Sequence, residues 1–524
     1  MYIKLFGAHL LGLESQIVEI EVDISSGLPH FDIVGLPGSA LKESKERVRA
    51  AIKNSGYQFP MKRITVNLAP ADIRKEGSYF DLALGLAILL ADEQIQLTKE
   101  QFGELEQCLF VGELALDGST RKGDGIFPLV LSAKEKRYQY IFIPKENYPE
   151  IANVEGIESI PISNLKELIN FLKESEGLSK SLVHLQSKIQ LVSIQNDDMA
   201  LSKDTVPFEE IRGQENVKRA LEVAACGNHH VLMIGPPGSG KTMMASSFGM
   251  LLPALTEEQA IEVMKVYSVS GRLHEISNGQ IKRPFRSPHH TITTTAMVGG
   301  GVPVRPGEIS LAHHGVLFLD EFLEFKRPVL EALREPLEDG KITISRNHHP
   351  FVFPANFILV VAMNPCPCGF YGYETEVKKC TCSASQIEKY QSKLSGPLYD
   401  RLDIHIDVPL ISYEELTRSS PENKEFSTNE MRKRIQRALD FKKERMGQAT
   451  SSKSRSKRIA EECQLTPGAE ELMKMAFDQL QFSARGYNKI LKLARTIADL
   501  NQSIYVDEKA IAEAISYRSL DRNR

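Results

Sequence analysis

A glycine-rich segment in the middle of the chain has the spacing of a loop that holds phosphates. It follows the pattern G-x-x-x-x-G-K-[ST] with Gly235, Pro236, Pro237, Gly238, Ser239, Gly240, Lys241 and Thr242. The glycines let the backbone bend so that its N–H groups face an anion at the start of a helix. We expect Lys241 to reach the β- and γ-phosphates of ATP and Thr242 to hold Mg²⁺.

The segments on either side of this loop decide between phosphate binding and a plain Gly/Pro-rich turn. Val231–Ile234 is an apolar run that predicts a strand, and Thr242–Leu252 can form the following helix. A strand, the loop and a helix in this order are the setting in which the pattern binds phosphate. The flanking sequence therefore favours a nucleotide site.

Two acidic residues follow a second apolar run. Val316–Leu319 predicts a buried strand, and Asp320 and Glu321 come directly after it. A parallel strand would deliver both carboxylates at its C-terminal edge, beside the phosphates. We predict that Asp320 coordinates Mg²⁺ and that Glu321 orients or deprotonates the attacking water. An apolar run ending in two acids is common by itself, but its place about 80 residues after the loop favours this interpretation.

A third apolar run, Ile358–Met363, ends at Asn364. An amide at this place can position the attacking water without adding charge. The alternative is a turn asparagine before Pro365. The ordered set of strands favours the functional role of Asn364.

Two arginines later in the chain are candidates for contact with the γ-phosphate. Arg401 follows a turn, and an arginine supplied by a neighbouring subunit stabilises charge on a transferring phosphoryl group, so Arg401 predicts an oligomer. The alternative is a surface pair with Asp403. Arg485 precedes the helical run Asn488–Leu500 and could act from a helical lid. Arg495 competes for that role, and either residue could be a solvated helix charge.

Four of the seven cysteines lie close together in the sequence. They form two C-x-C pairs with eleven residues between them: Cys366, Cys368, Cys380 and Cys382. Four thiolates suit tetrahedral Zn²⁺, although C-x-C is a less usual spacing than C-x-x-C. The alternative is four reduced cysteines that stiffen the loop after Asn364. The other three cysteines are isolated and are interpreted as buried packing residues.

The elements that must position these residues divide the chain into several parts. At 524 residues the chain is too long for a single core. Residues 1–172 read as mixed α/β, and residues 173–207 are polar and predict a linker. Strands and helices alternate over 208–410, as in a parallel-sheet α/β domain, and 411–524 is predominantly helical. The fold class is therefore a multidomain α/β protein.

Composition limits the classes of partner. The net charge is −4, so nucleic-acid binding would have to come from local patches. The segment Met431–Arg458 holds eleven Lys/Arg against Asp440 and Glu444, although such a run is usually a solvated helix face. No run approaches the ~18 apolar residues of a membrane span, and the N-terminus lacks secretory-signal features. We expect a cytoplasmic protein without disulfides.

Together the motifs resemble the magnesium-chelatase-like branch of AAA+ proteins and, more closely, the ComM/YifB family. The resemblance covers nearly all of the chain. Besides the phosphate loop, it rests on longer segments: RPFRSPHHT (283–291), PGEISLAHHGVLFLDE (306–321), AMNPCPCG (362–369) and SGPLYDRLD (395–403). It implies an AAA+ core with a helical lid, ATP and Mg²⁺ as ligands, and a hexameric ring.

The resemblance also implies two hairpins that face a central pore in related rings. One is an insertion around Thr291–Pro303, and the other lies around Lys341–Pro354. The candidates for pore contacts are Arg286, His289, His290, His348 and His349. Histidines in such rings are otherwise often hydrogen-bonded structural residues.

The N-terminal part resembles the fold of Lon protease. In the Lys75–Asp81 segment the nucleophile position falls on Tyr79, and the partner lysine falls near Phe127. Ser78 and Lys122 are nearby, but a serine without a general base is a poor nucleophile. We therefore predict a non-proteolytic scaffold or DNA-handling module.

The resemblance suggests three functions. ComM-like proteins are linked to branch migration and helicase action during integration of incoming DNA, which implies a DNA motor in recombination or natural transformation. Single-stranded, forked or branched DNA would then be the partner. A magnesium-chelatase-type motor is the first alternative, and the Lon-like domain argues against it. An ATP-dependent protease is the second, and Tyr79 and Phe127 argue against it.

Overall fold

The computed structural model describes residues 2–71, 75, 77–174, 205–276, 281–346, 349–375, 378–417, 424–446, 462–480 and 483–518. They divide into two compact units, the first within 1–196, 260–281 and 345–353, and the second within 197–259, 282–344 and 354–524. Most of the predicted linker, residues 447–458 of the basic segment and His348 lie outside the described residues. The predicted domain boundaries stay predictions.

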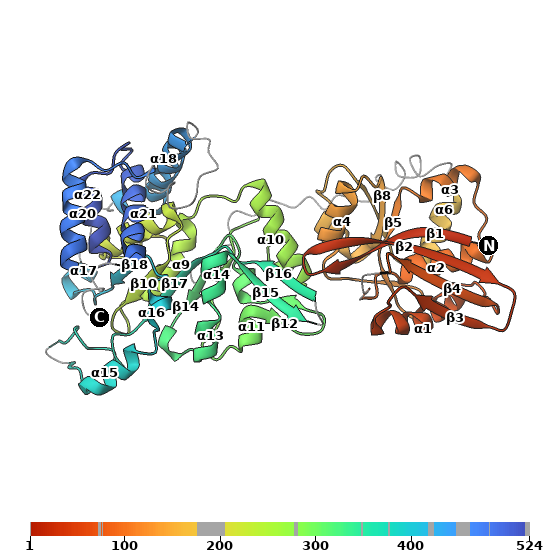
Figure 1. The fold of residues 1–524 in the computed structure, drawn as a ribbon, viewed down its shortest axis with the longest axis horizontal. Helices are drawn as coiled ribbons and strands as arrows, with labels where there is room; N and C mark the ends of the chain where they lie inside the picture. Colours follow the sequence, from red (N-terminus) through yellow and green to blue (C-terminus); the bar gives the residue numbers. More distant parts are fainter. Residues whose placement is uncertain are drawn as a thin grey trace. The chain divides into compact units, whose positions relative to one another are not determined.

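A four-stranded sheet begins the first unit (Figure 1). Its order is β1-β2-β4-β3, with β1 (Tyr2–Leu11), β2 (Glu14–Ser25), β3 (His30–Val34) and β4 (Arg63–Ala69). The β1/β2 and β2/β4 pairs are antiparallel, and β3 runs parallel to β4. One face of β2 is buried, because Val18, Ile20, Val22 and Ile24 alternate with more exposed residues along the strand.

The second sheet of this unit is parallel, with the order β5-β8-β9. Its strands are β5 (Cys108–Phe110), β8 (Tyr140–Pro144) and β9 (Glu158–Ile162), beside the short hairpin of β6 (Glu113–Leu114) and β7 (Thr120–Arg121). The helices are α1 (Ser39–Asn54), α2 (Asp81–Ala91), α3 (Lys99–Leu105), α4 (Ile126–Glu135), α5 (Tyr148–Ile151) and α6 (Leu165–Glu174). Every residue of α2 is buried, because the helix packs on β1, β2, α1 and α6.

A five-stranded parallel sheet forms the centre of the second unit. Its order is β11-β14-β17-β10-β18, with β10 (Val231–Ile234), β11 (Phe285–Arg286), β14 (Val316–Leu319), β17 (Ile358–Met363) and β18 (Ile404–Asp407). The three predicted strands are confirmed, and β14 and β17 are buried along their whole length, as parallel strands covered on both faces are. Ile234 pairs with Met363 and Leu319 with Val361, so the carboxyl ends of the central strands meet at one edge.

The helices of the second unit flank the sheet or extend the chain beyond it. Those before β17 are α8 (Glu215–Gly227), α9 (Lys241–Phe248), α10 (Glu257–Val269, which the first unit shares), α11 (Thr294–Val298), α12 (Glu308–Leu311), α13 (Arg327–Glu331) and α14 (Arg334–Asp339). Those after it are α15 (Ala384–Gln391), α16 (Gly396–Tyr399), α17 (Tyr413–Thr417), α18 (Thr428–Met446), α20 (Pro467–Leu480), α21 (Ala484–Leu500) and α22 (Glu508–Ser516).

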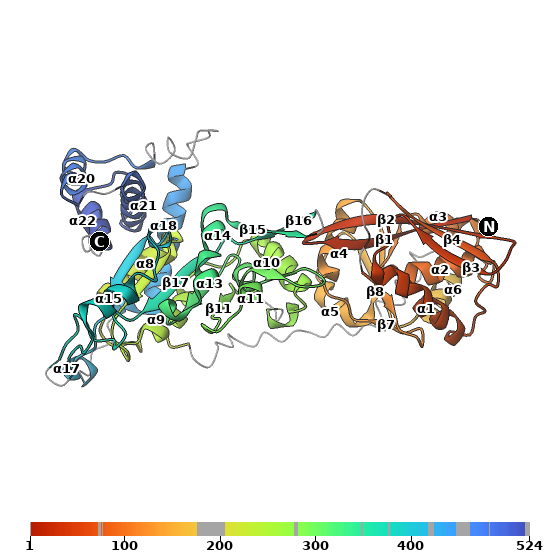
Figure 2. The same ribbon diagram turned by 60° about the horizontal axis from the view of Figure 1, so that its bottom comes forward.

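The C-terminal helices share one apolar core with the sheet. α20, α21 and α22 lie side by side in both views (Figures 1 and 2), and their apolar faces join those of α8, α9 and α18. Glu222 on α8 is fully buried and pairs with Arg219 at 3.0 Å and with Arg434 of α18 at 2.6 Å. A buried carboxylate is costly unless it is paired, so these arginines fix α18 to α8.

Both hairpins that the resemblance implies are present. β12 (Gly299–Gly300) pairs with β13 (Arg305–Pro306), and β15 (Lys341–Arg346) pairs with β16 (His349–Pro354). None of the described helices combines the length and apolar character needed to cross a bilayer. The three isolated cysteines are buried, as predicted: Cys108, Cys226 and Cys463.

Candidate nucleotide site

The glycine-rich loop joins β10 to α9 at the carboxyl edge of the sheet. The Lys241 ammonium donates to the carbonyl oxygens of Gly235 and Pro236, both at 2.8 Å. A Cβ atom at Gly235 would lie 2.2 Å from the Val408 carbonyl oxygen, so only glycine fits where the loop begins. Burial lowers the pKa of Lys241, and the charge of Asp320 opposes that shift. The loop thus holds a cation against backbone carbonyls.

Thr242 and Asp320 meet beside the loop. The Thr242 hydroxyl donates to an Asp320 carboxylate oxygen at 2.6 Å, and the Glu321 N–H donates to the other oxygen at 2.8 Å. Hydroxyl and carboxylate oxygens are ligands that Mg²⁺ prefers. These two side chains therefore fit the predicted metal position.

Glu321 has a strained backbone and an unforeseen partner. Its φ of 49° lies in the left-handed region, which costs a non-glycine residue about 1–2 kcal/mol. One of its carboxylate oxygens lies 3.0 Å from His290 Nδ1. His290 was a candidate for pore contacts, whereas the structure places its ring against the predicted catalytic carboxylate. β11 and β14 are parallel neighbours, so the segments that follow them lie close together.

Asn364 completes the group. It follows β17, the strand between β10 and β14, and its side-chain oxygen lies 3.4 Å from the Lys241 ammonium. The structure therefore brings together the five groups predicted to bind and cleave ATP: Lys241, Thr242, Asp320, Glu321 and Asn364.

Arg401 and Arg485 do not join this group of five residues. Both contact one acidic residue elsewhere in the second unit. Both guanidinium groups contact the Glu338 carboxylate of α14, and the Arg485 contact measures 3.3 Å. Arg401 also donates to the Pro397 carbonyl oxygen at 2.6 Å. Among the described residues neither arginine contacts the glycine-rich loop of its own chain. Nothing in the local sequence predicts that Glu338 binds two arginines, because other acidic residues lie beside it on the same short helix.

The alternatives for these arginines can now be judged. Asp403 pairs with Lys489 at 2.8 Å, and Arg401 contacts Glu338, so the alternative of an Arg401–Asp403 surface pair is wrong. Arg495 is buried, and it pairs with Asp499 at 2.9 Å and donates to the Ile504 carbonyl oxygen at 2.7 Å. Arg485 has a side chain that is 64 % exposed. Of these two arginines, Arg485 is therefore the one that a ligand could reach.

The remaining pore candidates have local partners where they are described. Arg286 makes two hydrogen bonds to Glu308, at 2.6 and 2.9 Å. His289 Nδ1 lies 3.0 Å from the Thr291 hydroxyl. His348 and the side chain of His349 lie outside the described residues. Arg286 is thus held by Glu308, and its role in a pore stays a prediction.

The basic segment is only partly available for a ligand. Arg434 pairs with buried Glu222, and Arg445 pairs with Asp499 at 3.3 Å, so two of its charges hold α18 in place. The other face of α18 carries exposed basic residues, which are Arg432, Lys433, Arg437 and Lys443. These residues form a solvent-exposed face of the helix. The same face is the one that a phosphate backbone could reach.

The dyad positions of the N-terminal unit hold no described Ser–Lys pair. The Tyr79 hydroxyl donates to the Asp124 carbonyl oxygen at 2.6 Å, and the Phe127 N–H donates to the Ser268 hydroxyl at 3.3 Å. Ser78 donates to a carboxylate oxygen of Glu113, and the Lys122 ammonium pairs with Glu150. Ser78 and Lys122 therefore each have an acidic partner instead of one another.

We expect the purified chain to leave casein uncut with or without ATP, because Ser78 contacts the Glu113 carboxylate and not the lysine that activates the serine of a Ser–Lys dyad. Release of acid-soluble peptides measures this. Digestion that persists in Lys241→Ala and disappears in Ser78→Ala would show that Ser78 is a nucleophile after all.

The four clustered cysteines converge. Their sulfur atoms all lie within 4.8 Å of one another, and Cys366 is buried while the other three are half-buried. The structure thus brings the two C-x-C pairs to one point just beyond Asn364.

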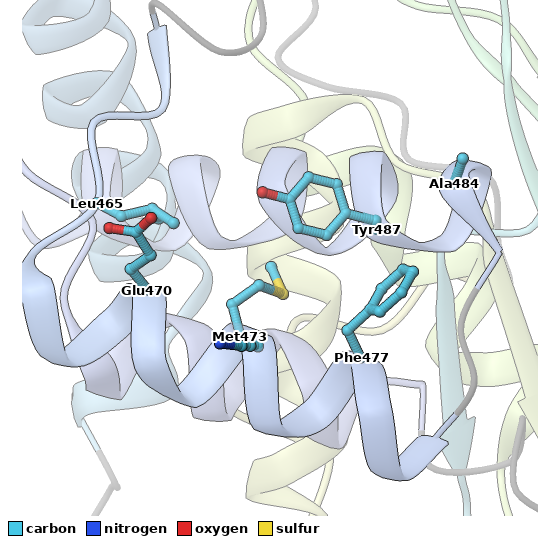
Figure 3. Close-up of a pocket in the computed structure, with 7 residues that line it drawn as sticks. Leu465, Glu470, Met473, Phe477, Ala484 and Tyr487 are labelled. Carbon is cyan, nitrogen blue, oxygen red and sulfur yellow. The ribbon is translucent and has the colours of Figure 1, made fainter.

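A separate pocket of about 440 Å³ lies in the C-terminal helices (Figure 3). Met473 and Phe477 of α20 face Tyr487 of α21 across it, and Leu465, Glu470, Lys474 and Ala484 complete its lining. None of the predicted site residues lines this pocket, so it is distinct from the nucleotide site.

Comparison with known families agrees with this geometry. The model for magnesium chelatase, subunit ChlI, matches residues 207–416, and the model for the ChlI C-terminal region matches 425–518. A third model, for subunit ChlI of Mg-chelatase, matches 20–147. The sheet order and the site thus define an ATP-binding AAA+ protein of the magnesium-chelatase type.

Two relatives are similar over nearly their whole length. Competence protein ComM of Haemophilus influenzae is 40% identical over 512 residues, which cover 98% of this chain and 96% of that protein. YifB of Escherichia coli is 39% identical over 514 residues, with the same coverage. The chain belongs to the ComM/YifB family. Lon protease 2 of Bacillus subtilis is 31% identical over 187 residues, 30% of this chain and 33% of that protein.

The match over residues 20–147 changes one argument from the sequence. The N-terminal part was expected to set the chain apart from chelatase motor subunits, yet a family model described as subunit ChlI matches it. The N-terminal unit therefore does not separate these two classes.

Proposed function

We propose that the chain is an ATP-hydrolysing ring motor that acts on DNA. The proposal of ATP hydrolysis rests on one observation, the convergence of several groups at one edge of the sheet. They are a phosphate-loop lysine, a hydroxyl–carboxylate pair, a second carboxylate and an amide. A cation, metal ligands, a base and a water-orienting group are the parts that phosphoryl transfer to water needs.

Each side chain has a role in this proposal. Lys241 binds the β- and γ-phosphates, and Thr242 and Asp320 hold Mg²⁺, which neutralises charge on the phosphate oxygens. Asn364 orients the attacking water, and Glu321 accepts its proton. One oxygen of the Glu321 carboxylate lies 3.0 Å from His290 Nδ1, so this ring helps to fix where the proposed base lies.

The arginines support a ring. Arg401 and Arg485 share Glu338 and make no described contact with the phosphate loop of their own chain. An arginine that completes a phosphoryl-transfer site can come from a neighbouring molecule. We propose that both complete the neighbour's site in a homo-oligomer, with a hexamer as the expected size.

The DNA part of the proposal rests on the relative named competence protein ComM and on charge. Exposed basic residues line one side of α18, and Lys341 is exposed at the start of the β15–β16 hairpin. Basic side chains bind the phosphate backbone without reading sequence. We propose single-stranded, forked or branched DNA in the cytoplasm as the substrate, with branch migration or unwinding as the outcome.

DNA should raise the ATPase rate, and ATP should drive branch migration of a four-way junction. Migration should be absent with a non-hydrolysable analogue and in Glu321→Gln. Arg437→Glu on α18 should weaken DNA binding. It should also reduce the slope of the logarithm of the binding constant against the logarithm of the salt concentration by about 1, because one phosphate contact is lost. Lys509→Glu, an exposed charge on α22, is the matched control and should bind DNA normally.

If DNA neither binds at low salt nor stimulates hydrolysis, the DNA-motor proposal fails. A magnesium-chelatase-type remodelling ATPase is then the better candidate, and the three ChlI-type family matches favour it specifically. Under that candidate the ATPase rate responds to a partner protein and not to nucleic acid.

A further inference from the structure

The four clustered cysteines have the geometry of a metal site. Cys366 Sγ lies 3.3 Å from Cys368 Sγ and 3.8 Å from Cys380 Sγ, and Cys368 and Cys380 are 3.5 Å apart. A disulfide needs an S–S distance of about 2.05 Å. Tetrahedral Zn²⁺ with Zn–S bonds of about 2.3 Å places its sulfur ligands about 3.8 Å from one another. The three separations lie at or slightly below that value, and all are too long for a disulfide bond.

The chain between the two cysteine pairs is irregular. Residues 366–382 contain no helix or strand among those described, and Tyr371 is 49% exposed. The Tyr371 N–H donates to Cys366 Sγ at 3.4 Å, so the backbone turns around the sulfur atom. Thiols are weak hydrogen-bonding groups and would add little to the stability of such a loop. A metal ion accounts for the convergence of all four.

The charges around the cluster suit four thiolates. One Zn²⁺ ion with four thiolates carries a net charge of −2, and four protons leave the thiols when the metal binds. Lys378 and Lys379 directly precede Cys380, and both are exposed. These two lysines offset the negative charge at the rim of the site.

This loop packs on the phosphate-binding loop. A Cβ atom at Gly369 would lie 2.6 Å from Pro237 Cδ, so the Gly369 backbone packs closely against the proline ring. The Tyr373 hydroxyl contacts an Asp407 carboxylate oxygen at 2.8 Å and the Ile234 carbonyl oxygen at 3.4 Å, directly before Gly235. The cysteine loop thus touches the phosphate loop at Pro237 and the end of β10 at Ile234, and it begins two residues after Asn364.

We propose that Cys366, Cys368, Cys380 and Cys382 bind one Zn²⁺ ion as four thiolates, and that this ion holds their loop against the phosphate-binding loop. A site with four protein ligands has no open position, so the metal is structural. The second half of the proposal rests on the nucleotide site proposed above, whereas the first half does not depend on it.

Zinc content tests the first half without reference to activity. The metal-replete full chain should contain about one zinc per chain by elemental analysis, and Co²⁺ in its place should show the absorption of tetrahedral thiolate coordination. Cys380→Ser/Cys382→Ser should lose both signals, whereas Cys108→Ser, which changes a buried thiol outside the cluster, should keep them. No zinc in the unmodified chain, or zinc retained in the double variant, would overturn the site.

Nucleotide affinity tests the second half. The double serine variant should bind a fluorescent ATP analogue more weakly. Tyr373→Phe should keep its zinc and bind the analogue about fivefold more weakly, as expected for one lost hydrogen bond. Unchanged affinity in both variants would overturn the coupling and leave the metal site standing. Neither readout involves DNA, so failure of the DNA-motor proposal gives a different pattern, with zinc and nucleotide binding intact.

Discussion

Glu321→Gln is expected to bind ATP normally and to hydrolyse it at least about 100-fold more slowly, whereas Lys241→Ala should lose nucleotide binding. Glutamine keeps the size of the side chain but cannot accept the proton of water, and a positioned base contributes about 10²–10⁴-fold. Lys241 is the cation held against the carbonyls of Gly235 and Pro236, so its loss removes the charge that faces the phosphates.

Steady-state phosphate release and equilibrium ATP binding measure the two effects separately. Glu324→Gln is the matched control, because Glu324 is an exposed acid three residues further on. It should hydrolyse ATP at the unmodified rate. Hydrolysis by Glu321→Gln at the unmodified rate would show that another group is the base.

Arg401→Ala should lower the hydrolysis rate by about 10³-fold or more, the range known for arginines supplied across an interface. Mixing it with Lys241→Ala subunits should restore part of the rate. At some mixed interfaces an intact phosphate loop of the Arg401→Ala chain faces an intact Arg401 of the Lys241→Ala chain. Neither variant alone can form such an interface.

Arg327 is an exposed arginine of α13, and Arg327→Ala is the control. This variant should hydrolyse ATP at the unmodified rate without being mixed with other subunits. Light scattering under the assay conditions gives the size of the particle. A monomer that hydrolyses ATP at full rate in the presence of DNA would contradict the proposal that Arg401 acts on a neighbour.

The central elements could be predicted from the sequence because their signals are local. Each buried strand is a short apolar run, and each candidate residue follows such a run directly, as Asp320 follows β14 and Asn364 follows β17. Parallel strands end at one edge, so local order was enough to predict that these residues converge.

The partners of the site residues could not be predicted in this way. Glu338 precedes Arg401 by 63 residues and Arg485 by 147, and only packing brings it to both. The contact between His290 and Glu321 depends on the pairing of β14 with β11. Since β11 has only two residues, it has no apolar periodicity by which the sequence could reveal it. The basic run of α18 overstates the charge available to a ligand, because Arg434 pairs with Glu222, and Glu222 lies on α8, far away in the sequence.

Glu338, which contacts Arg401 and Arg485, lies close in sequence to the β15–β16 hairpin. Only Asp339 and Gly340 separate it from Lys341, where β15 begins. A strand that leaves a helix after so short a connection cannot shift without turning the end of that helix. We therefore expect a displacement of the first residues of β15 to reach Glu338, and with it the two guanidinium groups that contact its carboxylate.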